Sequence, residues 1–251
     1  MELGLKDKVV IVTGASRGIG AAIAAGLAHH GATVVINYFQ SRGHAEKLMN
    51  VLQKNGGTGL TLQADVRDHE QVSGMVDTVI KEFGKVDALV NNANINFPVK
   101  PFTDLAWGEL EAKVMGEMKA LYNCSQAVLK HMIERKQGKL IFISSGLSRR
   151  PGYGFSAHAA AKSAVDGIAK VMAMELGAYG ITVNVVGPGL TLTDAIARQP
   201  KEMLERSAAA NPLKRIGSPD DIAGAVVFLA SSLSDYITGE YIPVNGGSFM
   251  V

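Results

Sequence analysis

The sequence predicts a single α/β domain in which an open parallel sheet of about seven strands carries helices on both faces. Short apolar runs rich in β-branched residues alternate with longer stretches whose apolar residues recur at helical spacing. This alternation is typical of parallel strands that are joined by right-handed helical crossovers. The 251 residues suit one large domain, residues 1–251, and no linker, repeat or low-complexity tract divides them.

The expected strands are apolar runs with turn residues on either side. The clearest is Val9 to Val12, because four consecutive β-branched residues indicate a strand that is buried on both faces. The same rule predicts strands at residues 33–38, 60–64, 86–91, 139–144, 181–187 and 241–244.

The expected helices lie between these strands. Gly31 ends the first helix, residues 18–30, and Gly56 with Gly57 ends the second, because glycine commonly terminates a helix. The further helices are predicted at residues 42–54, 70–83, 107–135, 155–179, 201–210 and 220–230.

The composition is that of an ordinary globular protein. Hydrophobic residues make up 47% and charged residues 19%, which argues against disorder. A net charge of +2 is too small to indicate a nucleic acid or a membrane as partner. The single cysteine, Cys124, excludes an intramolecular disulfide and fits a reducing compartment. Since the sequence shows no signal-peptide pattern, no membrane-length apolar run and no zinc-type spacing, we expect a cytoplasmic protein without a metal.

A glycine-rich turn between the first strand and the first helix predicts a dinucleotide site. Gly14, Gly18 and Gly20 allow a tight turn, and they let backbone amides approach a pyrophosphate at a helix N-terminus. A strand before the turn and a helix after it are the context that this interpretation requires.

Motifs along the rest of the chain, in order and in register, resemble those of the short-chain dehydrogenase/reductase family. The other matches are Asp65-Val66, Asn91-Asn92-Ala93 with Asn94 in a glycine's place, Ile143-Ser144-Ser145, Asn184 with Pro188-Gly189 and Thr193, residues 220–223, residues 237–239 and residues 244–247. Within the family, the chain resembles the 3-oxoacyl-[acyl-carrier-protein] reductases. The resemblance implies a Rossmann-type fold, a nicotinamide cofactor and the exchange of a ketone with a secondary alcohol.

The resemblance also implies where the cofactor lies. The expected cofactor-binding residues are Gly14, Ser16, Arg17, Gly18, Ile19, Gly20, Asn37, Tyr38, Ser41, Asp65, Val66, Asn92, Ala93, Asn94, Lys162, Pro188, Gly189, Thr191 and Thr193. Binders of NAD usually carry a carboxylate at the end of the second strand, and this chain has Asn37 and Tyr38 there. Because Arg17 and Arg42 add cations that suit a phosphate, we predict NADP(H), with NAD(H) as the alternative.

The expected catalytic residues are Ser145, His158, Lys162 and Glu117. Ser145 stands 13 residues before His158, and Lys162 stands four after it, which is the family's spacing of serine, tyrosine and lysine. In the family the serine polarises the carbonyl, the tyrosine exchanges the proton, and the lysine tunes the tyrosine and binds the nicotinamide ribose. His158 stands in the tyrosine's place. By counting along the helix, Glu117 takes the place of an asparagine that holds a relay water.

Histidine is competent for this proton transfer, since imidazole has an ordinary pKa near 6.5. Imidazolium can supply the proton that the developing alkoxide needs. The Lys162 charge opposes imidazolium at His158, whereas a nearby Glu117 favours it. We therefore expect a working reductase with a His/Lys/Glu relay.

Other interpretations stay open at this point. The chain could bind cofactor with weak or no turnover and act through redox sensing or a partner, because fold does not guarantee function. Tyr153 could donate the proton, or His158 could serve a non-redox reaction. Enoyl reductases of related fold place their tyrosine seven residues before the lysine, where this chain has Phe155, and this disfavours enoyl reduction.

The substrate is expected over the carboxyl ends of the strands, against residues 94–97, 147–155 and 190–203. A mostly apolar lining is expected from Ile95, Phe97, Leu147, Tyr153, Leu190, Leu192 and Ile196. Arg149 and Arg150 suggest either an acidic substrate or a solvated loop. The partner is thus a small carbonyl or acyl-thioester substrate. By resemblance, the long helices at 107–135 and 155–179 predict a homotetramer, with a dimer as the alternative.

Overall fold

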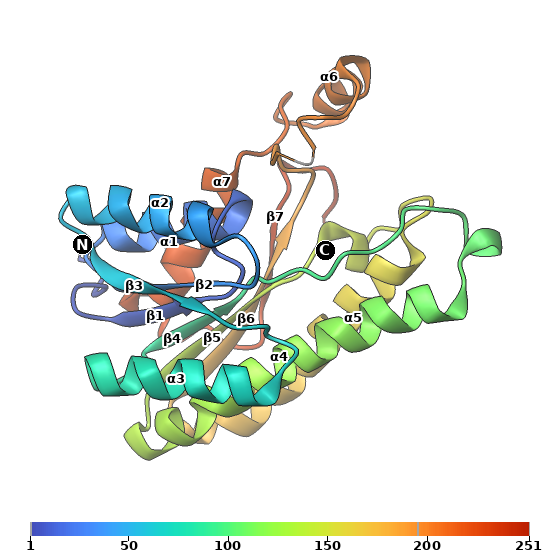
Figure 1. Ribbon diagram of the computed structural model, residues 1–251. Coiled ribbons are helices and arrows are strands. Elements are labelled where there is room, and N and C mark those ends of the chain that lie inside the picture. Colours follow the sequence, from blue (N-terminus) through green and yellow to red (C-terminus); the bar gives the residue numbers. More distant parts are fainter. Residues whose placement is uncertain (1, 195, 251) are drawn as a thin grey trace.

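A computed structural model, which describes residues 2–194 and 196–250, has the predicted doubly wound architecture (Figure 1). Seven parallel strands form one sheet in the order β3-β2-β1-β4-β5-β6-β7. The strands are β1 (Val9–Val12), β2 (Thr33–Tyr38), β3 (Thr58–Gln63), β4 (Ala88–Asn91), β5 (Gly138–Ile143), β6 (Ile181–Pro188) and β7 (Tyr241–Val244).

The helices cover both faces of the sheet. They are α1 (Gly18–His29), α2 (Arg42–Lys54), α3 (His69–Phe83), α4 (Trp107–Arg135), α5 (Ser156–Leu176), α6 (Lys201–Ala210) and α7 (Pro219–Ala230). Short 3-10 helices lie at Phe102–Asp104, Gly146–Ser148, Gly177–Tyr179 and Ser232–Ser234. The last turn expected for the helix at 155–179 is therefore a 3-10 turn, which ends at Gly180 in a left-handed conformation.

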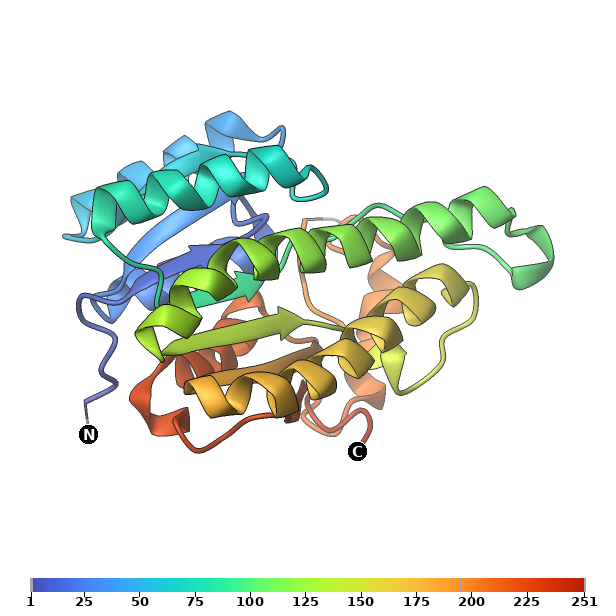
Figure 2. The same cartoon turned by 90° about the horizontal axis from the view of Figure 1, so that it is seen from below.

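Two apolar cores lie on opposite faces of the sheet. One packs α1, α2 and α7 against the strands, and the other packs α3, α4 and α5. β1 faces both cores, because Val10 and Val12 lie in the first and Val9 and Ile11 in the second. Figure 2 shows α4 and α5 side by side beneath the sheet, with the carboxyl ends of the strands pointing towards the same end of the molecule.

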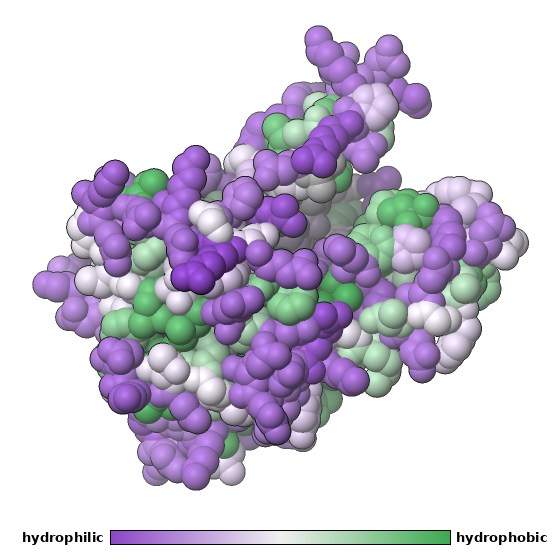
Figure 3. All heavy atoms as spheres, viewed as in Figure 1, coloured by the Kyte–Doolittle hydropathy of each residue, from purple (hydrophilic) through white to green (hydrophobic). Residues whose placement is uncertain are grey.

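The strand order reverses between β1 and β4, which pair directly. In such a sheet the crevice for a ligand lies outside the carboxyl ends of the strands at this reversal. On the surface, Figure 3 shows a hollow between α6 and the loop that joins β4 to α4. Among the described residues, no helix is both long and apolar enough to cross a bilayer.

Candidate functional site

The turn after β1 presses against the end of β4. Gly14 has a φ of +61°, and a Cβ added there would lie 2.9 Å from the Ala93 Cα. A Cβ added at Gly20 would lie 2.4 Å from the Asn92 Nδ2 and 2.7 Å from the Gly14 carbonyl. Only glycine fits these two positions without displacing backbone. The first turn of α1 follows at once, and its N-cap, Arg17, makes no side-chain hydrogen bond to it.

Side-chain amides hold this turn in place. The Asn37 Oδ1 accepts a hydrogen bond from the Gly14 N–H at 3.2 Å, and its Nδ2 donates to the Ala64 carbonyl at 3.1 Å. The Asn92 Nδ2 donates to the Thr13 carbonyl at 2.8 Å. Asn37 is only 1% exposed, so its side chain shapes the glycine turn from below. Tyr38 beside it is buried as well.

The other expected cofactor residues surround the same crevice. Asp65 is held by Arg67 through a bidentate contact of 2.7 to 3.2 Å, and Val66 is buried. A Cβ on Gly18 would lie 3.6 Å from the Thr193 side chain, so the loop after β6 reaches the glycine turn. The remaining expected residues, Ser16, Ile19, Ser41, Ala93, Asn94, Pro188, Gly189 and Thr191, lie in the loops between these elements or at their ends.

These features fit a nicotinamide dinucleotide. A turn that excludes a Cβ at Gly14 and Gly20 lets the backbone approach a pyrophosphate, and the uncapped first turn of α1 offers amide donors to an anion. Of the two arginines expected near the adenosine, Arg42 is paired with Glu46 at 2.7 Å. Arg17 is exposed and makes no ion pair with a described residue.

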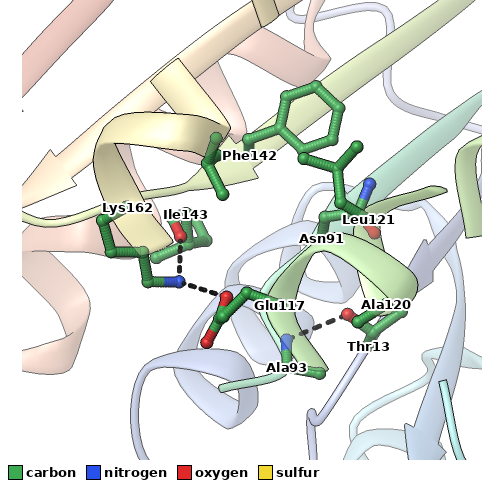
Figure 4. A pocket seen from close by; sticks show the side chains of 10 residues that line it. Thr13, Asn91, Ala93, Glu117, Ala120, Leu121, Phe142, Ile143 and Lys162 are labelled. Atoms are coloured by element: carbon green, nitrogen blue, oxygen red, sulfur yellow. Dashed lines mark hydrogen bonds and ion pairs between the residues drawn. The ribbon is translucent and has the colours of Figure 1, made fainter. Parts of the chain in front are cut away.

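The chemical centre lies where β5 ends and α5 begins. Ser145 lies two residues after Ile143, the last residue of β5, and the Ser144 hydroxyl donates to the Lys162 carbonyl at 3.4 Å. The Lys162 ammonium donates to the Ile143 carbonyl at 3.0 Å and to the Glu117 carboxylate at 2.9 Å (Figure 4). The structure thus brings Lys162 and Glu117 into direct contact. Both residues line a small cavity of about 10 Å³, which is the lower limit of the volume that holds one water molecule.

Glu117 lies between two buried lysines. Its Oε2 contacts Lys162, its Oε1 contacts the ammonium of Lys113 at 2.5 Å, and Oε1 also accepts the Ile95 N–H at 3.1 Å. Burial alone raises the pKa of Glu117, but the charges of Lys162 and Lys113 outweigh it and hold this pKa at about 2. The carboxylate is therefore ionised at any pH at which the protein works.

His158 is buried and uncharged at neutral pH. It is 8% exposed, its ring stacks on Phe97 at 4.4 Å between centroids, and its Nδ1 has no hydrogen-bond partner among the described residues. Burial, followed by the charges of Lys113 and Lys162, lowers the pKa of His158 to about 3, and Glu117 offsets this only in part. The expected imidazolium is therefore not the resting form of this ring. The position near the N-terminus of α5 disfavours a positive charge further.

Lys113 is a residue of this site that the sequence interpretation missed. Its side chain is 0% exposed, and its Nζ donates to the Asn94 Oδ1 and the Ile95 carbonyl, each at 2.7 Å, besides Glu117. Burial lowers the pKa of Lys113 to about 8, against the opposing effect of Glu117. One signal was present in the sequence, because Lys113 and Glu117 are four residues apart and share a helix face.

One residue of the expected substrate walls contacts this centre. Phe97 covers His158 from the loop after β4, whereas Tyr153 is 85% exposed. Arg149 pairs with Asp166 at 3.2 Å and lies over the Tyr241 ring, and Arg150 donates to the Ser248 carbonyl. Both arginines therefore have partners within the chain, and neither is merely a solvated charge.

Known proteins resemble the chain over nearly its whole length. A family model described as "Enoyl-(Acyl carrier protein) reductase" matches residues 14–248. A 3-oxoacyl-[acyl-carrier-protein] reductase of Vibrio harveyi is 39% identical over 251 residues, which is 99% of this chain and 100% of the relative. One of Staphylococcus aureus is 37% identical over 245 residues, which is 97% and 98% of the two chains.

Two solved structures have the same architecture. A gluconate 5-dehydrogenase from Burkholderia cenocepacia, in complex with NADP and tartrate, matches with a TM-score of 0.91 and 32% identity over 98% of this chain and 97% of the other. A 7 alpha-hydroxysteroid dehydrogenase, in complex with NADH and 7-oxo glycochenodeoxycholic acid, matches with a TM-score of 0.92 and 32% identity over 98% and 96%.

Proposed function

We propose that this chain, which belongs to the short-chain dehydrogenase/reductase family and is an oxidoreductase of CH–OH and C=O groups, reduces the ketone of a 3-oxoacyl thioester with NADPH. One observation carries the proposal. Lys162, whose ammonium is held by Glu117 and by the Ile143 carbonyl at the end of β5, lies one helical turn after His158. A lysine fixed in this way can hold a ribose while its neighbours handle the reacting oxygen.

The chemistry divides among these residues. The bound nicotinamide supplies the hydride that the carbonyl carbon accepts. Ser145 and the ring N–H of His158 donate hydrogen bonds to the carbonyl oxygen, because a neutral imidazole can polarise a carbonyl as a donor. As negative charge develops on that oxygen, the ring releases one proton to it and regains one from solvent. The ring thus stays neutral, and Lys162 stays paired with Glu117.

We assign NADP(H) to the site. The support is Arg17, an exposed guanidinium at the N-terminus of α1, together with the absence of a carboxylate at residues 37 and 38 at the end of β2. Guanidinium pairs well with a phosphate, whereas NAD binders place a carboxylate at this strand end. One of the two similar structures contains NADP and the other NADH. A homotetramer in the cytoplasm stays a prediction.

A steady-state assay tests the proposal. The protein is mixed with NADPH and a panel of ketones that includes acetoacetyl thioesters, and cofactor oxidation is followed by absorbance. We expect turnover by the wild type, a loss of about 10²- to 10⁴-fold in kcat for His158→Ala, and unchanged turnover for the exposed His29→Ala. Equal rates for His158→Ala and the wild type would exclude the role given to His158.

The second candidate is a cofactor-binding protein with weak or no turnover. The low pKa of His158 favours it, because imidazolium, the stronger acid, is scarce at neutral pH. Tight NADPH binding without oxidation across the whole panel, at several pH values, would establish this candidate in place of the first.

A further inference from the structure

Lys113 links the positions at which this chain departs from the pattern of its family. Those positions are Asn94, Glu117 and His158. The Lys113 ammonium touches the first two directly, at 2.7 Å and 2.5 Å. It also lies 4.8 Å from the centroid of Phe97, whose ring stacks on His158. A single buried side chain thus contacts two of the departures and reaches the third through one aromatic ring.

A fully buried lysine is costly unless all of its charge is compensated. Lys113 meets this condition with three oxygen partners, one from α4 and two from the loop after β4. Two of these contacts fasten the loop to the helix, because Asn94 and Ile95 both lie in the loop. Phe97 follows two residues later, so the same anchor holds the aromatic ring over His158.

The third contact decides the charge around the imidazole. Lys162 occupies only the Oε2 of Glu117, and Lys113 occupies the Oε1. Among the described residues, the charged groups that act on His158 are Lys113 and Glu117 from α4 and Lys162 from its own helix, and the loop after β4 contributes the uncharged ring of Phe97. Two cations and one carboxylate give the surroundings of the ring a net positive charge, which opposes a positive charge on the imidazole.

We propose that Lys113 is a positioning residue of this active site, which fastens the loop at residues 94–97 over His158 and keeps the imidazole uncharged by sharing Glu117 with Lys162. Lys113 does not touch the reacting atoms. The inference rests on the proposed oxidoreductase function for its kinetic readout, whereas its electrostatic part can be measured without turnover.

The kinetic test uses alcohol oxidation, because the ring must be uncharged to accept the alcohol's proton. A 3-hydroxybutyryl thioester and NADP⁺ serve as substrates, and kcat/KM is measured from about pH 5 to pH 8 for the wild type, Lys113→Met and the exposed Lys119→Met on the same helix. For the wild type and Lys119→Met we expect kcat/KM to show no fall towards the acid end of this pH range. For Lys113→Met we expect an acid limb that lowers kcat/KM about ten-fold for each pH unit below the new pKa of His158.

Asn94→Ala separates the two parts of the role. It removes one loop contact and leaves the Lys113–Glu117 charges in place, so we expect a higher KM with an unchanged pH profile. A purely structural lysine would lower activity equally at every pH. If Lys113→Met does not fold, Lys113→Gln, which keeps a polar group for Glu117, replaces it in every measurement.

A carbon-13 NMR titration of the His158 ring, in the wild type and Lys113→Met, provides the readout that needs no turnover. We expect the midpoint to move to higher pH in the variant. Identical midpoints and identical pH profiles would overturn the inference while leaving the proposed function intact. A wild type that does not turn over would contradict the proposed function, and the titration would still decide the role of Lys113.

Discussion

Replacement of Glu117 by glutamine should destabilise the protein strongly, and only above the pH at which the carboxylate ionises. The side chain is 4% exposed, and Glu117→Gln keeps its shape while removing the charge that Lys113 and Lys162 share. The pKa of Glu117 lies at about 2 against an ordinary 4.5, and at about 1.4 kcal/mol per pH unit this difference is worth about 3 kcal/mol. Breaking a buried ion pair by removing one partner typically costs about 3 to 5 kcal/mol, which agrees.

The pH dependence follows from the direction of the shift. Because the pKa of Glu117 is lower in the folded than in the unfolded chain, its stabilisation is complete above about pH 4.5 and is lost as the pH falls towards about 2. Urea unfolding, followed by circular dichroism, measures the difference between wild type and Glu117→Gln at pH 7 and at lower pH, with the exposed Glu111→Gln as control. A difference in unfolding free energy below about 1 kcal/mol at pH 7, the size typical of a surface ion pair, would contradict a strongly stabilising buried contact of Glu117 with the two lysines. So would a difference that does not narrow in acid.

Three further predictions concern the imidazole and the cofactor crevice. The folded chain resists protonation of His158, whose pKa is about 3 against an ordinary 6.5, so the stability of the wild type falls as the pH drops below about 6.5. In urea unfolding, His158→Phe should make this fall in stability with pH less steep. An unchanged dependence of stability on pH would count against a buried neutral ring. Gly20→Ala forces a Cβ to within 2.7 Å of a backbone carbonyl, so we expect the folded variant to bind NADPH about ten-fold more weakly, or worse, in a fluorescence titration. Wild-type affinity would contradict the assignment of the glycine turn to the pyrophosphate. Arg17→Glu should weaken NADPH binding at least ten-fold more than NADH binding, about 1.4 kcal/mol, and equal losses would remove Arg17 from the 2′-phosphate site.

The order of strands and helices was predictable because burial of the sheet on both faces leaves continuous apolar runs. Val9–Val12 is 3% exposed or less at every residue and begins and ends as expected. The start of β3 was missed by two residues. Gly59 sits in this strand at a φ of +151°, where a Cβ would lie 2.0 Å from the Val34 carbonyl, and neither Thr58 nor Gly59 gives an apolar signal.

The arrangement of the candidate site was predictable only in part. Spacing predicts the roles of Ser145, His158 and Lys162, and counting along the helix assigned Glu117 to the relay position. The structure then brings the Glu117 carboxylate to 2.9 Å from Lys162. The burial of Lys113 was not predictable, because a lysine in a helical pattern normally faces solvent and this one is covered by a loop. Asn37 was assigned to the cofactor from its place at a strand end. Its side chain points inward to the glycine turn because residues of a strand alternate between faces, and the sequence does not say which face is which.

The protonation state of the His158 ring could not be predicted from the sequence. It depends on the burial of the ring and on the positions of three charged neighbours, Lys113, Lys162 and Glu117. The titration of His158 itself is therefore the most direct test of a buried neutral imidazole, by carbon-13 NMR of wild-type protein labelled in its histidines and assigned with His158→Phe. We predict that the ring stays neutral from about pH 8 to below about pH 5, since burial and two lysines disfavour its positive charge. A midpoint at or above about pH 6, the ordinary range of histidine, would contradict it.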